Sequence, residues 1–178
     1  MQKGNSFSLE ICSEFPNGEF SFGTFVKYFM YSPKFRLMLN YRLGNRFYRS
    51  KLFIVRQLGL YLRTKMIVKR HCDFSYNAQI GLNLKLPHPL GIVIGDGVVI
   101  RDSVKIFQQV TLGSHGKSGE ELKYPVIESG VKIFAGAKII GGITIGENAI
   151  IGANAVVNID VPPNSTAVGI PCKIVSKK

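Results

Sequence analysis

The C-terminal part of the chain repeats an aliphatic residue every six positions. These residues form two runs in strict register: Ile94, Ile100, Ile106 and Leu112, then Ile127, Ile133, Ile139, Ile145, Ile151 and Val157. A helix would repeat near 3.6 residues and a simple strand every two, so neither explains the spacing. Six residues is the repeat of a parallel β-helix built from hexapeptides. The pattern predicts a mainly β fold of stacked triangular coils, with the leading aliphatic residues inside.

Two interruptions of this period predict where the coils carry extra chain. Fifteen residues separate the two runs, three more than two repeats, and the polar loop 113–125 fills the gap. A second interruption, of eight residues instead of six, precedes the first run and holds His88 between two prolines. Solenoids eject insertions as loops, often on the binding face. We expect the functional site near these loops, which carry His88 and His115.

The region 20–72 has a different texture. It holds twelve Lys and Arg and no acidic residue. These twelve basic residues account for nearly all of the chain's net charge of +12. Its apolar residues recur three and four positions apart, the spacing of amphipathic helices. Ser32-Pro33 predicts a helix start, and Gly44 or Gly59 a weak point or an end. We expect two or three short helices.

This basic, aromatic region has three possible roles. It can pack its apolar face on the rest of the protein, lie on an anionic membrane surface, or bind nucleic acid. No recognised motif supports the last, so no nucleic-acid partner is expected. We divide the chain into a basic helical segment, 1–72, and a β-helix domain, 73–178, with 113–125 as an excursion loop.

Composition excludes several classes of protein. Apolar residues make up 46% and charged residues 19% of the chain, which excludes a disordered protein. No apolar run reaches the roughly eighteen residues of a membrane span, and the first residues lack the pattern of a secretory signal. Three cysteines cannot build a disulfide framework. We expect a cytoplasmic protein, at the inner membrane face if 20–72 binds lipid.

Among the three histidines, His88 is the strongest candidate for a general base. Its proline neighbours stiffen the backbone, and imidazole titrates near neutrality. Asp73 lies fifteen residues earlier, close to one coil length, so stacking would bring its carboxylate to the imidazole. A surface histidine at a coil corner is the alternative. The histidines lack the close spacing of zinc ligands, so no metal is expected.

Five strings carry a resemblance to a known family: DFSYNAQIG (73–81), LPHPLGIVIG (86–95), VTLGSHGKSG (110–119), FAGAKIIG (134–141) and VPPNSTAVGIP (161–171). They resemble the hexapeptide-repeat acyltransferases, most closely the serine acetyltransferase branch. The resemblance implies a left-handed β-helix, acetyl-CoA as donor, and a homotrimer with active sites between subunits. His88 matches the family's catalytic base and Asp73 the carboxylate that orients it. The implied acetyl-CoA contacts are Ala135, Gly136, Ala153 and Lys173.

Departures from the family pattern shape the expected acceptor. The family has an aspartate where this chain has Pro87, an arginine and a histidine where it has Lys123 and Tyr124, and a helical segment twice as long. We therefore expect an O-acetyltransferase acting on a glycan hydroxyl of capsule, exopolysaccharide or lipopolysaccharide, free or lipid-linked. The expected substrate contacts are Tyr124, Lys123 and His115. The alternatives are a serine O-acetyltransferase of cysteine biosynthesis and a non-catalytic trimeric scaffold at a membrane surface.

Overall fold

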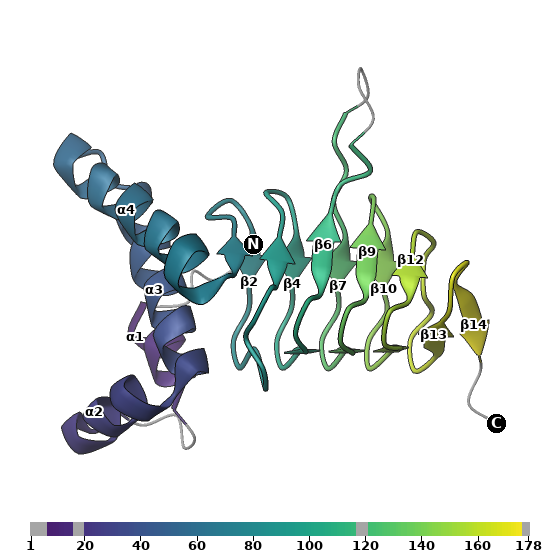
Figure 1. Ribbon diagram of the computed structural model, residues 1–178, viewed down its shortest axis with the longest axis horizontal. Helices are drawn as coiled ribbons and strands as arrows, with labels where there is room; N and C mark the ends of the chain where they lie inside the picture. The colour runs from purple at the N-terminus through teal and green to yellow at the C-terminus, as the bar shows by residue number, and fades with distance from the viewer. Residues whose placement is uncertain (1–6, 16–19, 117–120, 176–178) are drawn as a thin grey trace. The chain divides into compact units, whose positions relative to one another are not determined.

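The computed structural model describes residues 7–15, 20–116 and 121–175 (Figure 1). The chain forms two compact units, 1–70 and 71–178, the first helical and the second built of short strands. The domain division at 72/73 that we expect from composition stays a prediction.

The helical unit contains four described helices: α1 Phe7–Cys12, α2 Phe22–Tyr31, α3 Pro33–Tyr48 and α4 Phe53–Arg70. Three of them lie in the basic region, which confirms its predicted helical character. The predicted start at Ser32-Pro33 is also confirmed. The Ser32 hydroxyl accepts the amide N–H of Phe35 at 3.2 Å, and Pro33 occupies the first turn, where no amide donor is needed.

Two glycines allow α3 and α4 to approach closely. Gly44 lies inside α3 and Gly59 inside α4, so neither glycine ends a helix, and the predicted weak point stays a prediction. A Cβ atom on Gly59 would lie 2.6 Å from the Tyr48 amide nitrogen and 2.9 Å from the Gly44 carbonyl oxygen. Position 59 needs glycine because the two helix backbones touch there.

The helical unit leaves large apolar side chains exposed. Helix α2 has no buried residue, and α4 buries only Gly59 and Met66. The exposed apolar side chains are Phe22, Val26, Phe29, Met30 and Tyr31 on α2, and Phe53, Ile54, Leu58, Leu60, Tyr61, Ile67 and Val68 on α4. Within the described ranges, no helix is long and apolar enough to cross a bilayer. A membrane-surface contact of this region stays a prediction.

The second unit confirms the expected parallel β-helix, with three sheets as the sides of a stack of coils (Figure 1). The first sheet contains β1 Asp73–Phe74, β3 Val93–Ile94, β6 Thr111–Gly113, β9 Lys138–Ile140 and β12 Val156–Val157. The second contains β2 Gln79–Ile80, β4 Val99–Ile100, β7 Val126–Ile127 and β10 Thr144–Ile145. The third contains β5 Lys105–Ile106, β8 Lys132–Ile133, β11 Ile150–Ile151, β13 Thr166–Val168 and β14 Lys173–Val175. All pairs are parallel except β13 with β14.

The interior of the stack is the six-residue repeat itself. All ten leading aliphatic residues are at most 2% exposed. They lie opposite one another on neighbouring coils, as Ile94 does with Leu112 and Ile133 with Ile151. Burying each such side chain stabilises the fold by about 1.5–3 kcal/mol. The period therefore specifies both the core and the register of the strands.

The corners between sheets explain the small and polar residues of the repeat. Positive φ angles recur six residues apart, at Ser103 and Gln109, Gly130 and Gly136, and Asn148 and Asn154. Glycine and asparagine tolerate this left-handed backbone best. At Gly136, with φ of 74°, an added Cβ would also collide with the Asn154 side chain of the next coil.

Candidate active site

His88 lies at the corner where the chain passes from the third sheet to the first. The preceding Lys85 forms a parallel bridge with Lys105, and the chain then turns into β3. The His88 side chain is exposed, and its carbonyl oxygen accepts the Leu90 amide N–H at 2.8 Å. Its imidazole lies 6.5 Å from the ring of Phe107, measured between centroids. This corner therefore presents the imidazole to solvent with an aromatic neighbour on one side.

Asp73, half-buried, begins β1 on the neighbouring coil. The Gly91 amide, three residues after His88, donates to the His71 carbonyl at 2.8 Å, and the Asp73 amide donates to Ile92 at 2.9 Å. The backbone carrying Asp73 thus runs beside the segment that follows His88, as the fifteen-residue spacing predicts. The interaction of the two side chains stays a prediction.

Each successive coil places one residue at this same corner. We call this series of residues the corner row: His88, Phe107, Phe134, Gly152 and Val168. Strand register places its last four members opposite one another. The Phe107 and Phe134 rings stack at 5.0 Å with 12° between their planes. Phe134 is 39% exposed, so the row offers an apolar aromatic surface beside His88.

The predicted acetyl-CoA contacts lie along the corner row. Ala135 and Gly136 directly follow Phe134, and Ala153 follows Gly152. Neighbouring coils are joined here, since the Asn154 amide donates to the Ala135 carbonyl at 2.9 Å. Across the described segments, the amide N–H groups of Ala135 and Ala153 donate to no backbone acceptor. They are therefore suited to hold a ligand carbonyl.

Lys173 lies at the far end of the same row. It is exposed in β14 and pairs with Val168, the last member. The structure therefore brings all four predicted donor contacts to the corner that carries His88. Sequence reasoning missed Phe107 and Phe134. Each directly follows a leading isoleucine of the repeat, and this phase is the signal that could have placed them at a corner.

The excursion loop leaves from a different corner, between the first and second sheets. It starts after β6 and returns at β7, and residues 117–120 lie outside the described part. The Tyr124 ring rests on Gly95 and Gly97, where a Cβ atom on Gly95 would lie 3.0 Å from Tyr124 Cε1. The exposed Lys123 lies with its stem against Gly142. His115 is half-buried two residues past β6.

The predicted acceptor contacts are therefore separated from His88 within one chain. His88 precedes the strands of the first sheet, whereas His115, Lys123 and Tyr124 follow them at the next corner. No group of His, Cys, Asp and Glu suited to a metal ion occurs among the residues described.

Comparison with known proteins identifies the family. The family model "Bacterial transferase hexapeptide (six repeats)" matches residues 124–158. The serine acetyltransferase of Escherichia coli (strain K12) is 41% identical over 148 residues, which cover 83% of this chain and 53% of that protein. The chain thus spans about half the length of the curated relatives it matches.

Solved structures extend the likeness over nearly the whole chain. Soybean serine acetyltransferase complexed with serine is 34% identical, with a TM-score of 0.77, over 94% of this chain and 67% of that one. A serine acetyltransferase in complex with CoA is 32% identical, with a TM-score of 0.76, over 95% and 68%. These neighbours agree with the left-handed β-helix that the resemblance implies.

The expected glycan acceptor is wrong, because the relatives over most of the chain are serine acetyltransferases. That expectation gave too much weight to Pro87, Lys123 and Tyr124. The Tyr124 ring packs on Gly95, and the stem of the exposed Lys123 lies against Gly142. Their departure from the family pattern therefore does not indicate a glycan acceptor. The chain belongs to the serine acetyltransferase family of hexapeptide-repeat transferases.

Proposed function

We propose that this chain transfers the acetyl group of acetyl-CoA to the hydroxyl of L-serine, giving O-acetylserine and CoA. The observation that carries the proposal is the likeness to a serine acetyltransferase complexed with serine, over 94% of this chain at 34% identity. The likeness to a structure in complex with CoA supports the donor.

In this proposal His88 is the general base. Its imidazole takes the proton of the serine hydroxyl as that oxygen attacks the acyl carbon. The carbon–sulfur bond then breaks, and the imidazolium returns the proton to the leaving sulfur, so atoms and charges balance. Asp73 is the positioning residue: its carboxylate would accept the other imidazole N–H, fix the tautomer and stabilise the imidazolium. The adjacent backbones of the two segments support this pairing.

The corner row would hold the donor. Phe107 and Phe134 offer an apolar surface for the thioester arm, and the amides of Ala135 and Ala153 offer donors to its carbonyl groups. Lys173 would meet the phosphates at the far end of the row, with Gly136 allowing close approach of the ligand. These residues lie at the same corner of the coils as His88, and this supports the proposed position of the donor.

The acceptor half of the site would come from a neighbouring subunit of a homotrimer. His115, Lys123 and Tyr124 lie at the corner after the first sheet, away from His88 of the same chain. Packing two copies side by side would bring one chain's His88 corner to the other's excursion loop. A trimer closes such a head-to-tail contact into a ring.

The direct test measures thiol release from acetyl-CoA by the purified chain, with L-serine and, separately, bacterial oligosaccharides as acceptors. We expect release with L-serine only, and its loss in His88→Gln. The matched control is Asn77→Ala, an exposed residue on the coil that carries Asp73 but at another corner. Release with a glycan but not with serine would overturn the proposal.

Mixing two inactive variants tests the shared site. His88→Ala and Tyr124→Ala trimers are unfolded and refolded together in equal amounts. Random assembly leaves about one quarter of the sites with both residues intact if each site joins two chains, because each contribution is intact half the time. No recovery of activity would show that the two residues act within one chain, whereas activity of the Tyr124→Ala protein by itself would show that Tyr124 is not required.

A further inference from the structure

The side of α4 that faces away from α3 is apolar along the whole helix. Ile54, Tyr61 and Val68 repeat every seven residues, which places them on one side of the helix. Leu58, four residues after Ile54, lies on the same side. We call these four residues the outer strip. Their exposed fractions range from 46% at Leu58 to 81% at Ile54. Because the 18 residues of α4 extend about 27 Å, the strip is a long apolar surface and not one exposed side chain.

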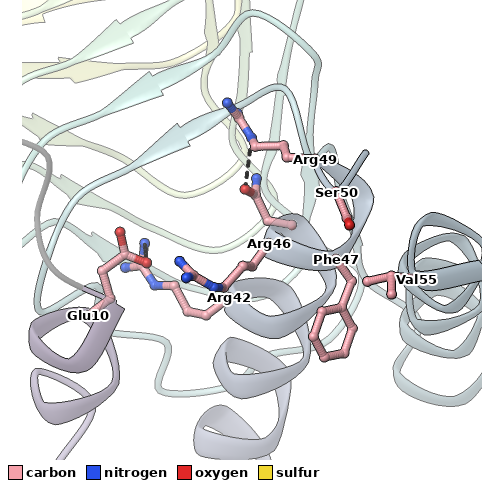
Figure 2. Close-up of a pocket in the computed structure, with 8 residues that line it drawn as sticks. Glu10, Arg42, Arg46, Phe47, Arg49, Ser50 and Val55 are labelled. Carbon is pink, nitrogen blue, oxygen red and sulfur yellow. Dashed lines mark hydrogen bonds and ion pairs between the residues drawn. The ribbon is translucent and has the colours of Figure 1, made fainter. Parts of the chain in front are cut away.

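The opposite side of α4 packs on α3. Gly59 and Met66 are the buried residues of α4, and a Cβ atom on Gly59 would lie 2.6 Å from the amide nitrogen of Tyr48. Figure 2 shows Val55 of α4 beside Phe47 of α3, and both residues line the same pocket. At 3.6 residues per turn, these contacts lie across the helix from the outer strip, so α3 does not cover the strip.

Lysines border the outer strip. Lys65 lies within it, four residues after Tyr61, and the exposed Lys69 follows four residues later. The exposed Lys51 precedes the helix. Helix α4 contains no acidic residue, and in the described ranges no acid forms an ion pair with any of these three lysines. The apolar strip is therefore accompanied by positive charge.

This charge decides which partner the surface fits. Two copies of α4 packed strip to strip would bring lysines together with no acid between them, and like charges across an interface oppose association. An anionic bilayer surface fits both features of the helix. Its phosphates attract Lys65 and Lys69, and the boundary below the headgroups accepts apolar side chains and the Tyr61 ring. An apolar strip on one side of a helix suits a position in the plane of such a surface.

We propose that α4 binds the surface of membranes that contain anionic lipid. The helix lies parallel to the bilayer, with the outer strip about 5–10 Å deep in the boundary between headgroups and acyl chains. Lys65 and Lys69 keep their stems along this boundary and place their ammonium groups on lipid phosphates. This surface contains no residue of the candidate active site, so the proposal is independent of acetyl transfer.

Vesicle sedimentation with the full chain tests the binding. The probes are vesicles of phosphatidylcholine alone and vesicles of an equal mixture of phosphatidylcholine and phosphatidylglycerol. We expect binding to the mixed vesicles, little binding to the neutral ones, and weaker binding as added salt screens the lysines. An absence of binding to the mixed vesicles would overturn the proposal.

A tryptophan reporter tests which surface enters the lipid. The chain contains no tryptophan, so Tyr61→Trp introduces a single reporter into the outer strip. Its emission should shift to the blue when mixed vesicles are added, because the ring leaves water. The control Ile159→Trp places the reporter at an exposed position of the β-helix and should not respond.

Two results of the reporter experiment would contradict the proposal. Equal responses at positions 61 and 159 would mean that the lipid does not select α4. Emission from Tyr61→Trp that is already shifted to the blue without vesicles would mean that protein covers the outer strip.

Removing apolar surface from the strip should weaken binding. I54Q with V68Q changes two side chains that are 81% and 64% exposed, so α4 should keep its packing on α3. We expect partitioning onto mixed vesicles to fall by about tenfold or more. The control I159Q with I170Q removes two exposed isoleucines of the β-helix and should bind as the unchanged chain does. Circular dichroism checks the helices, and equal losses in the two variants would exclude the outer strip as the binding surface.

Removing the bordering charge gives an independent test. K65Q with K69Q should lower partitioning onto mixed vesicles by about tenfold to thirtyfold, since each base near an anionic surface strengthens binding. The control K85Q with K132Q removes the same charge from exposed positions of the β-helix and should have little effect. Equal losses would show that the net charge of the chain, and not α4, attracts it to the vesicles.

Discussion

The two units of this chain are held together by different kinds of contact. In the β-helix, one aliphatic residue every six positions fills the interior, and each coil contacts its neighbours in the same way. In the helical unit, packing depends on single contacts, such as the crossing at Gly59, and the charged side chains of Glu14 and Arg42 are only 5% exposed. A repeat makes a fold readable from sequence, whereas individual contacts are visible only in three dimensions.

Removing the proposed base should give the largest effect and separate chemistry from folding. His88→Ala should lower turnover by about 10²–10⁴-fold, the usual contribution of a positioned base. The side chain is exposed, so the melting temperature should barely change. Thiol-release kinetics and thermal unfolding of the same preparation check both statements. A variant that keeps its turnover would remove His88 from the mechanism.

The side chains of the β-helix core are more deeply buried than those of α4, so truncating them to alanine should lower the free energy of unfolding by different amounts. Ile133→Ala removes atoms from the fully buried ladder and should cost about 2–5 kcal/mol in the free energy of unfolding. Leu58→Ala, at a side chain 46% exposed on α4, should change it by about 0.5 kcal/mol or less. Denaturant unfolding at matched protein concentration measures the difference. Similar costs would mean that the α4 face is covered in solution.

Two glycines of the helical unit should respond in opposite directions to alanine. Gly59→Ala places a methyl group against the backbone of α3 and should destabilise the chain by about 1–3 kcal/mol. Gly23→Ala, in α2, meets nothing within 4 Å and should stabilise by about 0.5–1 kcal/mol, as alanine favours helix. If both variants are neutral, the close crossing of α3 and α4 is absent in solution.

The smallest predicted effect concerns Tyr41, a buried residue of α3. Burial raises the pKa of Tyr41 to about 12, although the nearby Arg42 and Arg49 lower it. Between about pH 10 and 12 the unfolded chain therefore binds fewer protons, and stability must fall as pH rises. Tyr41 should contribute a loss of about 1 kcal/mol between pH 10 and 11, absent in Tyr41→Phe. Parallel slopes of the two proteins in this range would argue against a buried phenol.

The sequence predicts most of the β-helix because a residue's position within the six-residue repeat determines whether its side chain points inside. Ile94 and Ile133 are inside for the same reason, and the separation of Asp73 from His88 anticipates neighbouring coils. Phase does not show which side chains meet outside the coil. The stacking of Phe107 on Phe134 spans the excursion loop, so their separation of 27 residues matches no simple number of repeats.

The helical unit and the acceptor were harder to predict. Local rules treat Gly44 as a helix weak point, because they cannot anticipate a second helix crossing at Gly59. The sequence pattern wrongly assigns Tyr124 to a glycan site, because its packing on Gly95 and Gly97 depends on where the loop returns. In each case the missing information was a contact between segments distant in sequence.

The length of the corner row is set by the number of coils in the β-helix. Neighbouring strands lie about 4.8 Å apart, so the four steps from His88 to Val168 span about 19 Å along the stack. A ligand of this length that binds along the row with one end at His88 would have its other end beside Lys173. Adding or removing one coil would change that reach by a fixed step while leaving the chemistry at His88 untouched. On the proposed function, the number of coils would set the length of donor that the corner row can hold.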